Sequence, residues 1–549
     1  MARKSNKLIK GPTDQLANQS EPPMHMSGLR IGILGGNSQD FFANHSPFID
    51  LLKKEISAKG GYPLFFSLSG GMDDNVGIKS IVGNGKLENG KSHSTIAYNY
   101  GLPSRDIIAD QIEILVHQAQ LDGLIMLPWS VHSAVGMMMA TIRCGISVVF
   151  TPRYDQWELF SLIHAANAQI KNDIETPSYT QCSMLILMEV MGMVRIGTLD
   201  YFLNARDKNQ TDIPVLKKDV VQTFDPIGNS EWAAHRILDL AKQKISPRRF
   251  FSAAAFHNAL CADIAMGSST ESILHLSALA YESGLPFPLT QINEISKKVS
   301  VQATMDKSGE FSILSMEECG GVRGLIASIQ TYLQQSPTII GKNIVDLARD
   351  LSLHHSSLKL AKPTKKHGGM AVFYGNLATD GAIFRISGVK EQWFAKSAVA
   401  KVYDSESACI EAIATKKVKK EDAVVIRYCG PKGSPGMPLL HGIKKALQSH
   451  GLEESVLIIS DGRIPLSGKT PAFLHLSPEA AVGSALSIIQ TGDIIFWNLE
   501  DRSLTVRLTD TEIKVRLSRW REQVKNMRCG YLFRYAKYSS PSSIGAILI

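Results

Sequence analysis

The feature that most constrains the fold is an alternation of short apolar runs with helical patterns in the first part of the chain. Four runs are typical of buried strands: IGILGGNS (31–38), YPLFFSLS (62–69), GLIMLPW (123–129) and ISVVFTP (146–152). Helical patterns lie between them, at 49–58, 106–120 and 136–144. Because strands that alternate with helices are typical of a parallel sheet covered on both faces, this part predicts an α/β domain.

The pattern changes towards the C-terminus. A polar, basic stretch at 356–370 predicts a linker, and short β-rich runs between glycine turns follow it. These runs are AVFYGNL (371–377), DGAIFRIS (380–387), AVVIRY (423–428), SVLIISDG (455–462) and DIIFWN (493–498). We therefore expect a flexible arm at 1–28, an α/β domain at 29–355, and a β-rich domain at 371–549 that closes with a basic helix.

The composition narrows the class of protein. Hydrophobic residues make up 44% of the 549 residues and charged residues 20%, which excludes a mostly disordered chain. The seven cysteines include no C-x-x-C pair, so neither a disulfide framework nor a zinc ribbon is predicted. There is no run of about 18 apolar residues that would span a membrane, and residues 1–28 lack the apolar segment of a signal peptide. We expect a cytoplasmic protein with reduced thiols.

The net charge of +8 is concentrated near the C-terminus. Residues 514–537 contain one acid, Glu522, and the basic residues Lys514, Arg516, Arg519, Arg521, Lys525, Arg528, Arg534 and Lys537. A basic helix can contact phosphates, but no nucleic-acid-binding motif accompanies this one. A solvated helix face is therefore favoured, and nucleic-acid binding is not expected.

Glycine-rich clusters follow several of the predicted strands. They are GNLATDGA (375–382), RYCGPKGSPGMP (427–438), DGRIPLSGK (461–469) and HLSPEAA (475–481). Glycine at a strand end lets the backbone approach a ligand and expose its N–H groups. Each cluster alone is also compatible with a structural turn. The order of the clusters along the chain is therefore more specific than any one of them.

In that order, and together with further motifs, the clusters resemble the dihydroxy-acid dehydratase and phosphogluconate dehydratase family. The further motifs are GLPSRDIIADQIE (101–113), ADIAMGSSTESILHLSALAYESG (262–284), ECGGVRGLI (318–326) and GYLFRYAKYSSPSSIGA (530–546). The resemblance implies a parallel-sheet α/β domain, a β-barrel-like swivelling domain, and a homodimer with its active site between the domains. It also implies the loss of water from a 2,3-dihydroxy or sugar acid to give a 2-keto acid.

In the family, an iron–sulfur cluster acts as the Lewis acid, a magnesium ion holds the substrate and an alkoxide serine is the proposed base. This sequence departs from the family at those positions. The family's C-D-K motif falls on Ser130, Val131 and His132. Valine has no oxygen ligand for magnesium. A further cluster cysteine falls on Glu175, and a position that is cysteine in some members falls on His45.

The C-terminal positions depart as well. The family's glutamate in R-Y-E-G-P-K-G is Cys429, and the proposed serine base falls on Pro465, with Ser467 as the nearest replacement. Asp73 or Asp74 is the remaining match to the first metal aspartate. We therefore expect that the iron–sulfur cluster and magnesium are absent and that the protein is inactive or altered as a dehydratase.

Two positive hypotheses stay open. In the first, the pocket still binds a small carboxylic or sugar acid through Arg105, Lys432 and Arg463, with Ser104, Asp461 and His475 as weaker candidates. In the second, a replacement metal ion restores dehydratase activity. Its ligands would be His45, His132, Glu175 and Asp74, because two histidines with a carboxylate suit iron, zinc or manganese.

Overall fold

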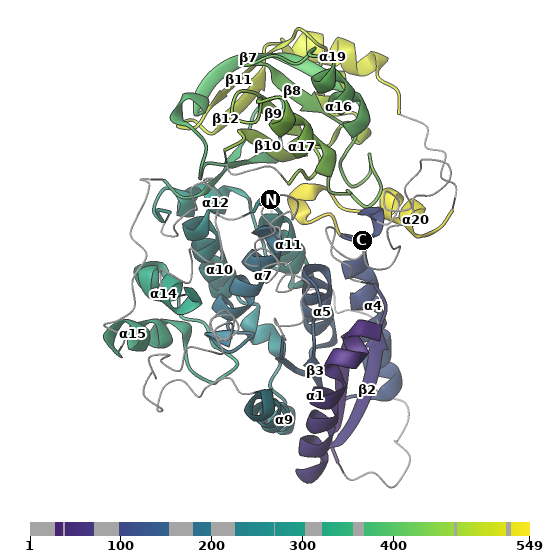
Figure 1. The fold of residues 1–549 in the computed structure, drawn as a ribbon, viewed down its shortest axis with the longest axis vertical. Coiled ribbons are helices and arrows are strands. Elements are labelled where there is room, and N and C mark those ends of the chain that lie inside the picture. Colours follow the sequence, from purple (N-terminus) through teal and green to yellow (C-terminus); the bar gives the residue numbers. More distant parts are fainter. Residues whose placement is uncertain are drawn as a thin grey trace, which may run out of the picture.

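The computed structural model describes residues 28–36, 39–70, 98–152, 179–198, 226–267, 269–301, 321–354, 367–465, 469–522 and 529–549. Within these ranges the chain forms a four-stranded parallel sheet in its N-terminal part and an eight-stranded mixed sheet in its C-terminal part (Figure 1). The predicted fold class is confirmed. The expected arm and most of the expected linker lie outside the described residues.

The N-terminal sheet has the order β2-β1-β3-β4. Its strands are β1 (Arg30–Gly36), β2 (Tyr62–Leu68), β3 (Gly123–Met126) and β4 (Ser147–Phe150), and all pairings are parallel. They coincide with the four predicted apolar runs. β3 and β4 are buried along their whole length, as expected for strands with helices on both faces.

Helices surround this sheet and continue beyond it. They are α1 (Gln39–Ala58), α4 (Ser104–Ala119), α5 (Val131–Cys144), α7 (Tyr179–Val190), α9 (Pro226–Lys242), α10 (Ala253–Met266), α11 (Thr270–Glu282), α12 (Thr290–Ser296), α14 (Gly321–Ser328) and α15 (Ile344–His354). Two helices begin earlier than the sequence predicts. The predicted helix 49–58 starts at Gln39, and the predicted helix 136–144 starts at Val131, because Ser130 caps it.

The C-terminal sheet has the order β12-β11-β7-β8-β9-β10-β6-β5. Its strands are β5 (Met370–Phe373), β6 (Gly381–Arg385), β7 (Ala395–Tyr403), β8 (Ala423–Ile426), β9 (Leu457–Ser460), β10 (Ala472–Ser477), β11 (Ile494–Asn498) and β12 (Ser503–Val506). A bridge between Tyr374 and Ser503 joins the two edges of the sheet, so it is nearly closed and barrel-like. The sequence prediction missed β7, β10 and β12. In β7, exposed and partly buried or buried residues alternate and no apolar run forms.

The helices of this domain are α16 (Glu406–Ala414), α17 (His441–Ser449), α18 (Ala485–Ile488), α19 (Asp510–Arg519) and α20 (Tyr531–Tyr538). The expected continuous basic helix over 514–537 does not form. α19 ends at Arg519, and Trp520 leaves the helix to pack on Gly483 and to donate from Nε1 to the Tyr428 hydroxyl at 3.3 Å. Arg516 pairs with Asp493, so part of the basic charge is neutralised within the domain.

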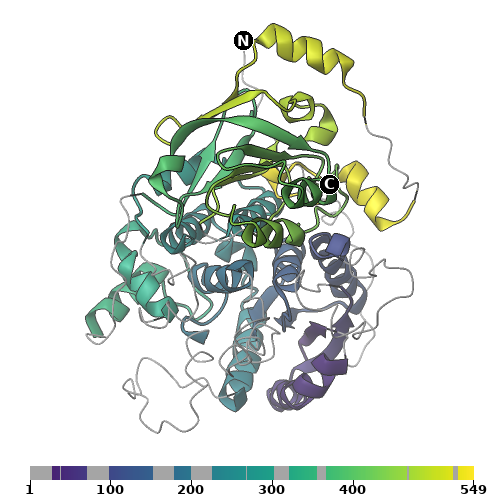
Figure 2. The same ribbon diagram turned by 45° about the horizontal axis from the view of Figure 1, so that its top comes forward.

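Polar contacts fix the two domains to each other. The Asn293 side chain on α12 donates to the Val372 carbonyl on β5 and accepts from the Val372 N–H. Ser387 and Arg385 both donate to the carbonyl of Gly267, at the C-terminal end of α10. Both views place the chain's C-terminus at the boundary between the domains (Figure 1 and Figure 2). The functional candidates lie along this boundary.

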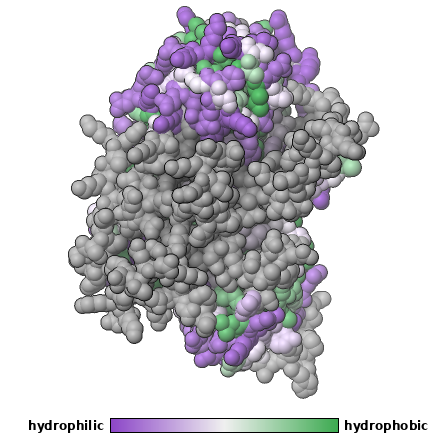
Figure 3. All heavy atoms as spheres, viewed as in Figure 1, coloured by the Kyte–Doolittle hydropathy of each residue, from purple (hydrophilic) through white to green (hydrophobic). Residues whose placement is uncertain are grey.

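Among the helices of the described ranges, none combines the length and the apolar character needed to cross a bilayer. Hydrophilic residues dominate the coloured surface of the C-terminal domain, and hydrophobic residues form only small patches between them (Figure 3).

Candidate ligand-binding site at the domain boundary

The N-terminus of α5 holds Ser130, Val131 and His132, on which the sequence resemblance places the C-D-K motif. The Ser130 hydroxyl accepts from the Ser133 N–H at 3.0 Å, and the Ser133 hydroxyl accepts from the Ser130 N–H at 2.8 Å, which forms a capping box. Val131 is buried in the hydrophobic core of the domain. Ser130 and Val131 therefore serve helix capping and packing.

His132 follows on the same helix and faces a second histidine. Its ring packs edge-on against that of His275 on α11, with the centroids 5.8 Å apart. Both side chains are buried. Burial, together with the positive charges of Arg105 and Arg463, holds the pKa of His275 well below its usual range, so this imidazole is neutral.

Arg105 connects this histidine to the end of the chain. It is fully buried near the start of α4, and its Nη1 lies 3.0 Å from His275 Nδ1. Nε donates to the Leu102 carbonyl at 3.1 Å, and Nη2 donates to the carbonyls of Gly545 and Ala546 at 2.8 and 3.1 Å. Through these hydrogen bonds, Arg105 links α4, α11 and the C-terminal residues.

Arg463 and His475 approach the same region from the C-terminal domain. Arg463 is fully buried, donates from Nε to the Met437 carbonyl at 2.7 Å, and places Nη1 3.4 Å from Glu271 Oε2 on α11. His475 is buried on β10 with a left-handed backbone (φ 54°). The boundary thus gathers arginine and histidine side chains from both domains.

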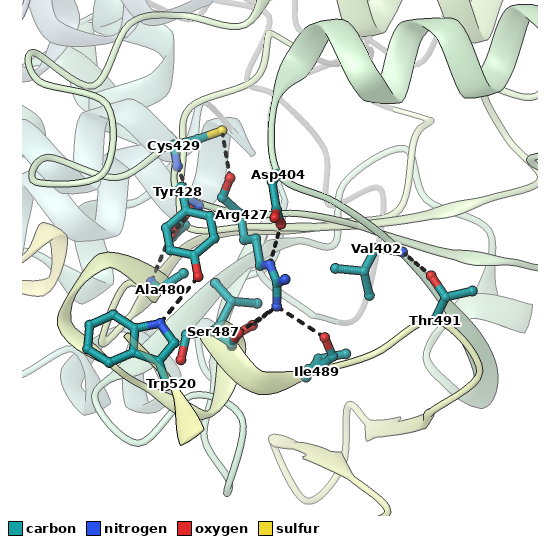
Figure 4. Close-up of polar contacts among 12 residues, drawn as sticks. Val402, Asp404, Arg427, Tyr428, Cys429, Ala480, Ser487, Ile489, Thr491 and Trp520 are labelled. Carbon is teal, nitrogen blue, oxygen red and sulfur yellow. Dashed lines mark hydrogen bonds and ion pairs between the residues drawn. The ribbon is translucent and has the colours of Figure 1, made fainter. Parts of the chain in front are cut away.

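Two carboxylates hold the glycine-rich loop after β8 in place. Asp461 accepts from the N–H groups of Tyr428, Cys429 and Ala480 at 3.2, 2.9 and 2.9 Å. Figure 4 shows the strand end from which these donors come, with Trp520 against Tyr428. The loop is therefore positioned by backbone hydrogen bonds to a buried acid.

Glu479 holds the middle of the same loop. It accepts from the Lys432 N–H at 3.0 and 3.1 Å and from the Gly433 N–H at 2.8 Å. A side chain at Gly430 would place its Cβ 2.6 Å from the Glu479 carboxylate, so this close approach requires glycine. The Lys432 ammonium reaches away to the Lys537 carbonyl at 3.3 Å.

Cys429, which replaces the family's glutamate, is part of the domain core. It is buried, and its Sγ lies 3.5 Å from the Arg427 carbonyl. Burial, reinforced by the charge of Asp461, raises the pKa of this thiol well above its usual range. Cysteine at this position also offers no oxygen atom, and magnesium takes oxygen ligands.

The structure brings some predicted site residues together and leaves others untested. Arg105, Arg463, His132 and His475 lie in one buried region, whereas Lys432 lies on the glycine-rich loop. Ser104 donates to the Gly101 carbonyl within its own turn.

The helix α1 contains His45, but its side chain lies outside the described part of the chain, as do Asp74, Glu175 and Ser467. Among described residues, no group of three His, Cys, Asp or Glu side chains is placed to hold a metal. The replacement-metal site stays a prediction.

The sequence interpretation did not single out His275 or Glu271. Both lie in the 262–284 motif, where they interrupt the largely apolar sequence of α11, TESILHLSALAYE. A histidine and an acid on a buried helix are a usable signal, because buried polar groups need partners from other elements.

The burial of His475 predicts a loss of stability in acid. Burial lowers its pKa from 6.5 to about 3. Because the folded pKa is depressed, the contribution to stability is complete above pH 6.5 and is lost as the pH falls towards 3. We expect the free energy of unfolding to drop by several kcal/mol over this interval. The drop should be smaller in His475→Asn, because asparagine does not titrate and also tolerates the left-handed backbone. Urea titrations at stepped pH would measure this, and equal slopes for both proteins would contradict it.

Known proteins resemble this chain over both of its domains. The fold and boundary site define a two-domain protein with an α/β domain, a barrel-like domain and a polar site between them. A sequence-family model described as "Dihydroxy-acid/6-phosphogluconate dehydratase N-terminal" matches residues 42–153 and 176–347, and its C-terminal counterpart matches 358–546. The chain belongs to the dihydroxy-acid/6-phosphogluconate dehydratase family.

Individual relatives agree with this assignment. The chain is 30% identical over 561 residues to a dihydroxy-acid dehydratase of Thermodesulfovibrio yellowstonii, with 96% of each chain covered. It is 32% identical over 550 residues to a dihydroxy-acid dehydratase of Endomicrobium trichonymphae, with 94% of each covered. The similarity therefore extends over both domains.

Proposed function

We propose that this chain is a dehydratase-family protein that has lost the canonical cluster and magnesium and that binds a small acid at the domain boundary. Catalysis by the family's ordinary dehydration is not expected of it. The homodimer implied by the family resemblance is part of the same proposal.

The proposal rests on the structural roles of Ser130, Val131 and Cys429. Ser130 caps α5, Val131 packs in the core, and Cys429 is a buried side chain with its sulfur 3.5 Å from a main-chain carbonyl. An iron–sulfur cluster needs thiolates, and magnesium needs oxygen ligands. The donor set at these positions does not fit either group, so no chemical step is assigned to them.

The charge of the boundary supports an acid as the ligand. Arg105 and Arg463 are buried there, and both contribute to the lowered pKa of His275. Glu271 compensates Arg463, while Arg105 is engaged mainly with carbonyl groups. A buried region with this positive potential favours an anionic ligand.

Elemental analysis of anaerobically purified protein tests the proposal. We expect iron, acid-labile sulfide and magnesium each well below one equivalent per chain, and no turnover on a panel of dihydroxy and sugar acids. A brown protein with stoichiometric iron and sulfide would contradict it. Stoichiometric zinc, manganese or sulfide-free iron, with turnover lost in His132→Ala, would instead establish the replacement-metal dehydratase.

Acid binding is a separate arm of the test. Calorimetric titration with D-gluconate and D-glycerate is expected to show saturable binding that the neutral polyol D-glucitol does not show. A matched surface variant, Arg349→Gln on α15, is expected to bind like the wild type, because Arg349 is exposed and pairs only with Asp346 among the described residues. Equal affinity for the acids and the polyol would count against an anion site.

A further inference from the structure

The boundary contains a histidine whose tautomer is fixed by its neighbour. Arg105 Nη1 lies 3.0 Å from His275 Nδ1. A guanidinium group can only donate hydrogen bonds, so Nδ1 of His275 must accept and carries no proton. The ring is neutral, since burial and nearby positive charge lower its pKa. The single ring proton therefore resides on Nε2.

The proton on His275 Nε2 has no hydrogen-bond acceptor among the described residues. His275 is fully buried, and its Nε2 has no hydrogen-bond partner among them. Leaving a buried donor unsatisfied costs about 1–3 kcal/mol, and native proteins seldom do so without a reason. A ligand oxygen that accepts from Nε2–H would remove this cost.

A second imidazole lies in the same region. His475 is also buried, and neither of its ring nitrogens has a hydrogen-bond partner among the described residues. The main chain at His475 is held by the Ser542 hydroxyl, which donates to the His475 carbonyl at 3.0 Å. Its charge, if present, would affect His275, so the two rings are electrostatically close.

The surroundings explain why both rings stay neutral. Burial lowers the pKa of both rings; the charges of Arg105 and Arg463 lower that of His275 further, and the charge of Arg463 lowers that of His475. A neutral imidazole offers one donor and one acceptor. His275 has already used its acceptor on Arg105, so it offers only a donor, whereas His475 offers both.

We propose that His275 and His475 form a pair of neutral imidazoles that hydrogen-bond the oxygen atoms of the bound acid, and that Arg105 is the positioning residue that fixes His275 as an Nε2–H donor. The inference rests on the proposed acid-binding function and deepens it. A carboxylate or hydroxyl oxygen accepts from His275. The unprotonated ring nitrogen of His475 needs a donor, which a hydroxyl group supplies and a carboxylate does not. The acid should therefore carry at least one hydroxyl group.

Nitrogen NMR of the ligand-free protein tests the tautomer. The chain has 15 histidines, and selective ¹⁵N-histidine labelling with the His275→Gln spectrum as reference assigns the resonances of His275. We expect a non-protonated Nδ1 and a protonated Nε2 at neutral pH. A proton on Nδ1, or an imidazolium ring, would overturn the inference without reference to any ligand.

Calorimetric titration with D-glycerate and D-gluconate tests the ligand contact. His475→Asn and His275→Leu are expected to weaken binding about tenfold or more, because leucine has no hydrogen-bonding group and the shorter asparagine does not reach the position of the imidazole Nε2. His275→Gln, whose amide can donate from a similar place, should retain most of the affinity. The matched control is His257→Gln on α10, where the His257 ring contacts the Tyr332 carbonyl away from this boundary.

The outcomes separate this inference from the proposed function. Unchanged affinity in both His475→Asn and His275→Leu would overturn the imidazole pair while leaving acid binding intact. If His275→Leu does not fold by circular dichroism, His475→Asn decides alone. Failure of both acids to bind the wild type would overturn the proposed function and the ligand contact together, and the tautomer would still be decided by the ligand-free spectrum.

Discussion

Asp461→Ala should destabilise the C-terminal domain by at least about 3 kcal/mol, because it leaves several buried donors without an acceptor. The carboxylate accepts from three main-chain N–H groups, those of Tyr428, Cys429 and Ala480. Asp461 is itself fully buried, so water cannot replace it without rearrangement of the glycine-rich loop. Urea or guanidinium unfolding would measure the change as a lower midpoint.

Two matched variants sharpen this measurement. Asp461→Asn keeps a carbonyl oxygen in the same place and is expected to lose less stability than alanine. Asp346→Ala removes an exposed acid that pairs with Arg349 at 3.5 Å and should change the free energy of unfolding by no more than about 0.5 kcal/mol. An alanine variant at position 461 with wild-type stability would show that the loop does not depend on this acid.

The second large effect is expected at Arg105. Arg105→Ala removes the donor to the carbonyls of Leu102, Gly545 and Ala546 and the partner of His275. Loss of one partner from a buried charged network typically costs about 3–5 kcal/mol. We expect this loss of stability together with release of the C-terminal residues from α4.

Hydrogen exchange distinguishes that release from general destabilisation. Amide protons in residues 539–549 should exchange much faster in Arg105→Ala, while those of β8 and β9, distant in the barrel-like sheet, change little under native conditions. Arg105→Lys keeps the charge but not the planar fork and should be nearly as harmful, whereas the exposed Arg349→Ala should not. Unchanged protection of the amide protons of residues 539–549 would show that Arg105 does not hold the C-terminal residues to α4.

Much of the fold could be predicted from periodicity alone. β1, β3 and β4 are largely buried, and all four strands of the parallel sheet are short apolar runs between breakers. β7 was missed for the opposite reason: its exposed positions include Val399, and its outward residues break any apolar run. The basic helix was predicted as one element because residues 514–537 share a charge, but a tertiary contact of Trp520 ends α19 at Arg519.

The site was predictable only in part. Arg105, Arg463 and His475 were chosen for their charge and their motifs, and they lie at one boundary. Their partners could not be foreseen, because Glu271 is 192 residues from Arg463 in sequence and Gly545 is 440 residues from Arg105. Nor could the sequence indicate that His275 completes the cluster.

The amino-acid sequence by itself determined much of the strand and helix pattern and the family resemblance, and it is the basis for the expectation that thiolate and oxygen ligands are missing. These depend on residue type and local periodicity, which the chain carries wherever it folds. The tertiary structure decided which buried charges meet and which carbonyl and carboxylate groups accept from Arg105 and Arg463. Those outcomes depend on contacts between distant segments, since hydrogen bonds in a buried boundary are set by the packing of both domains.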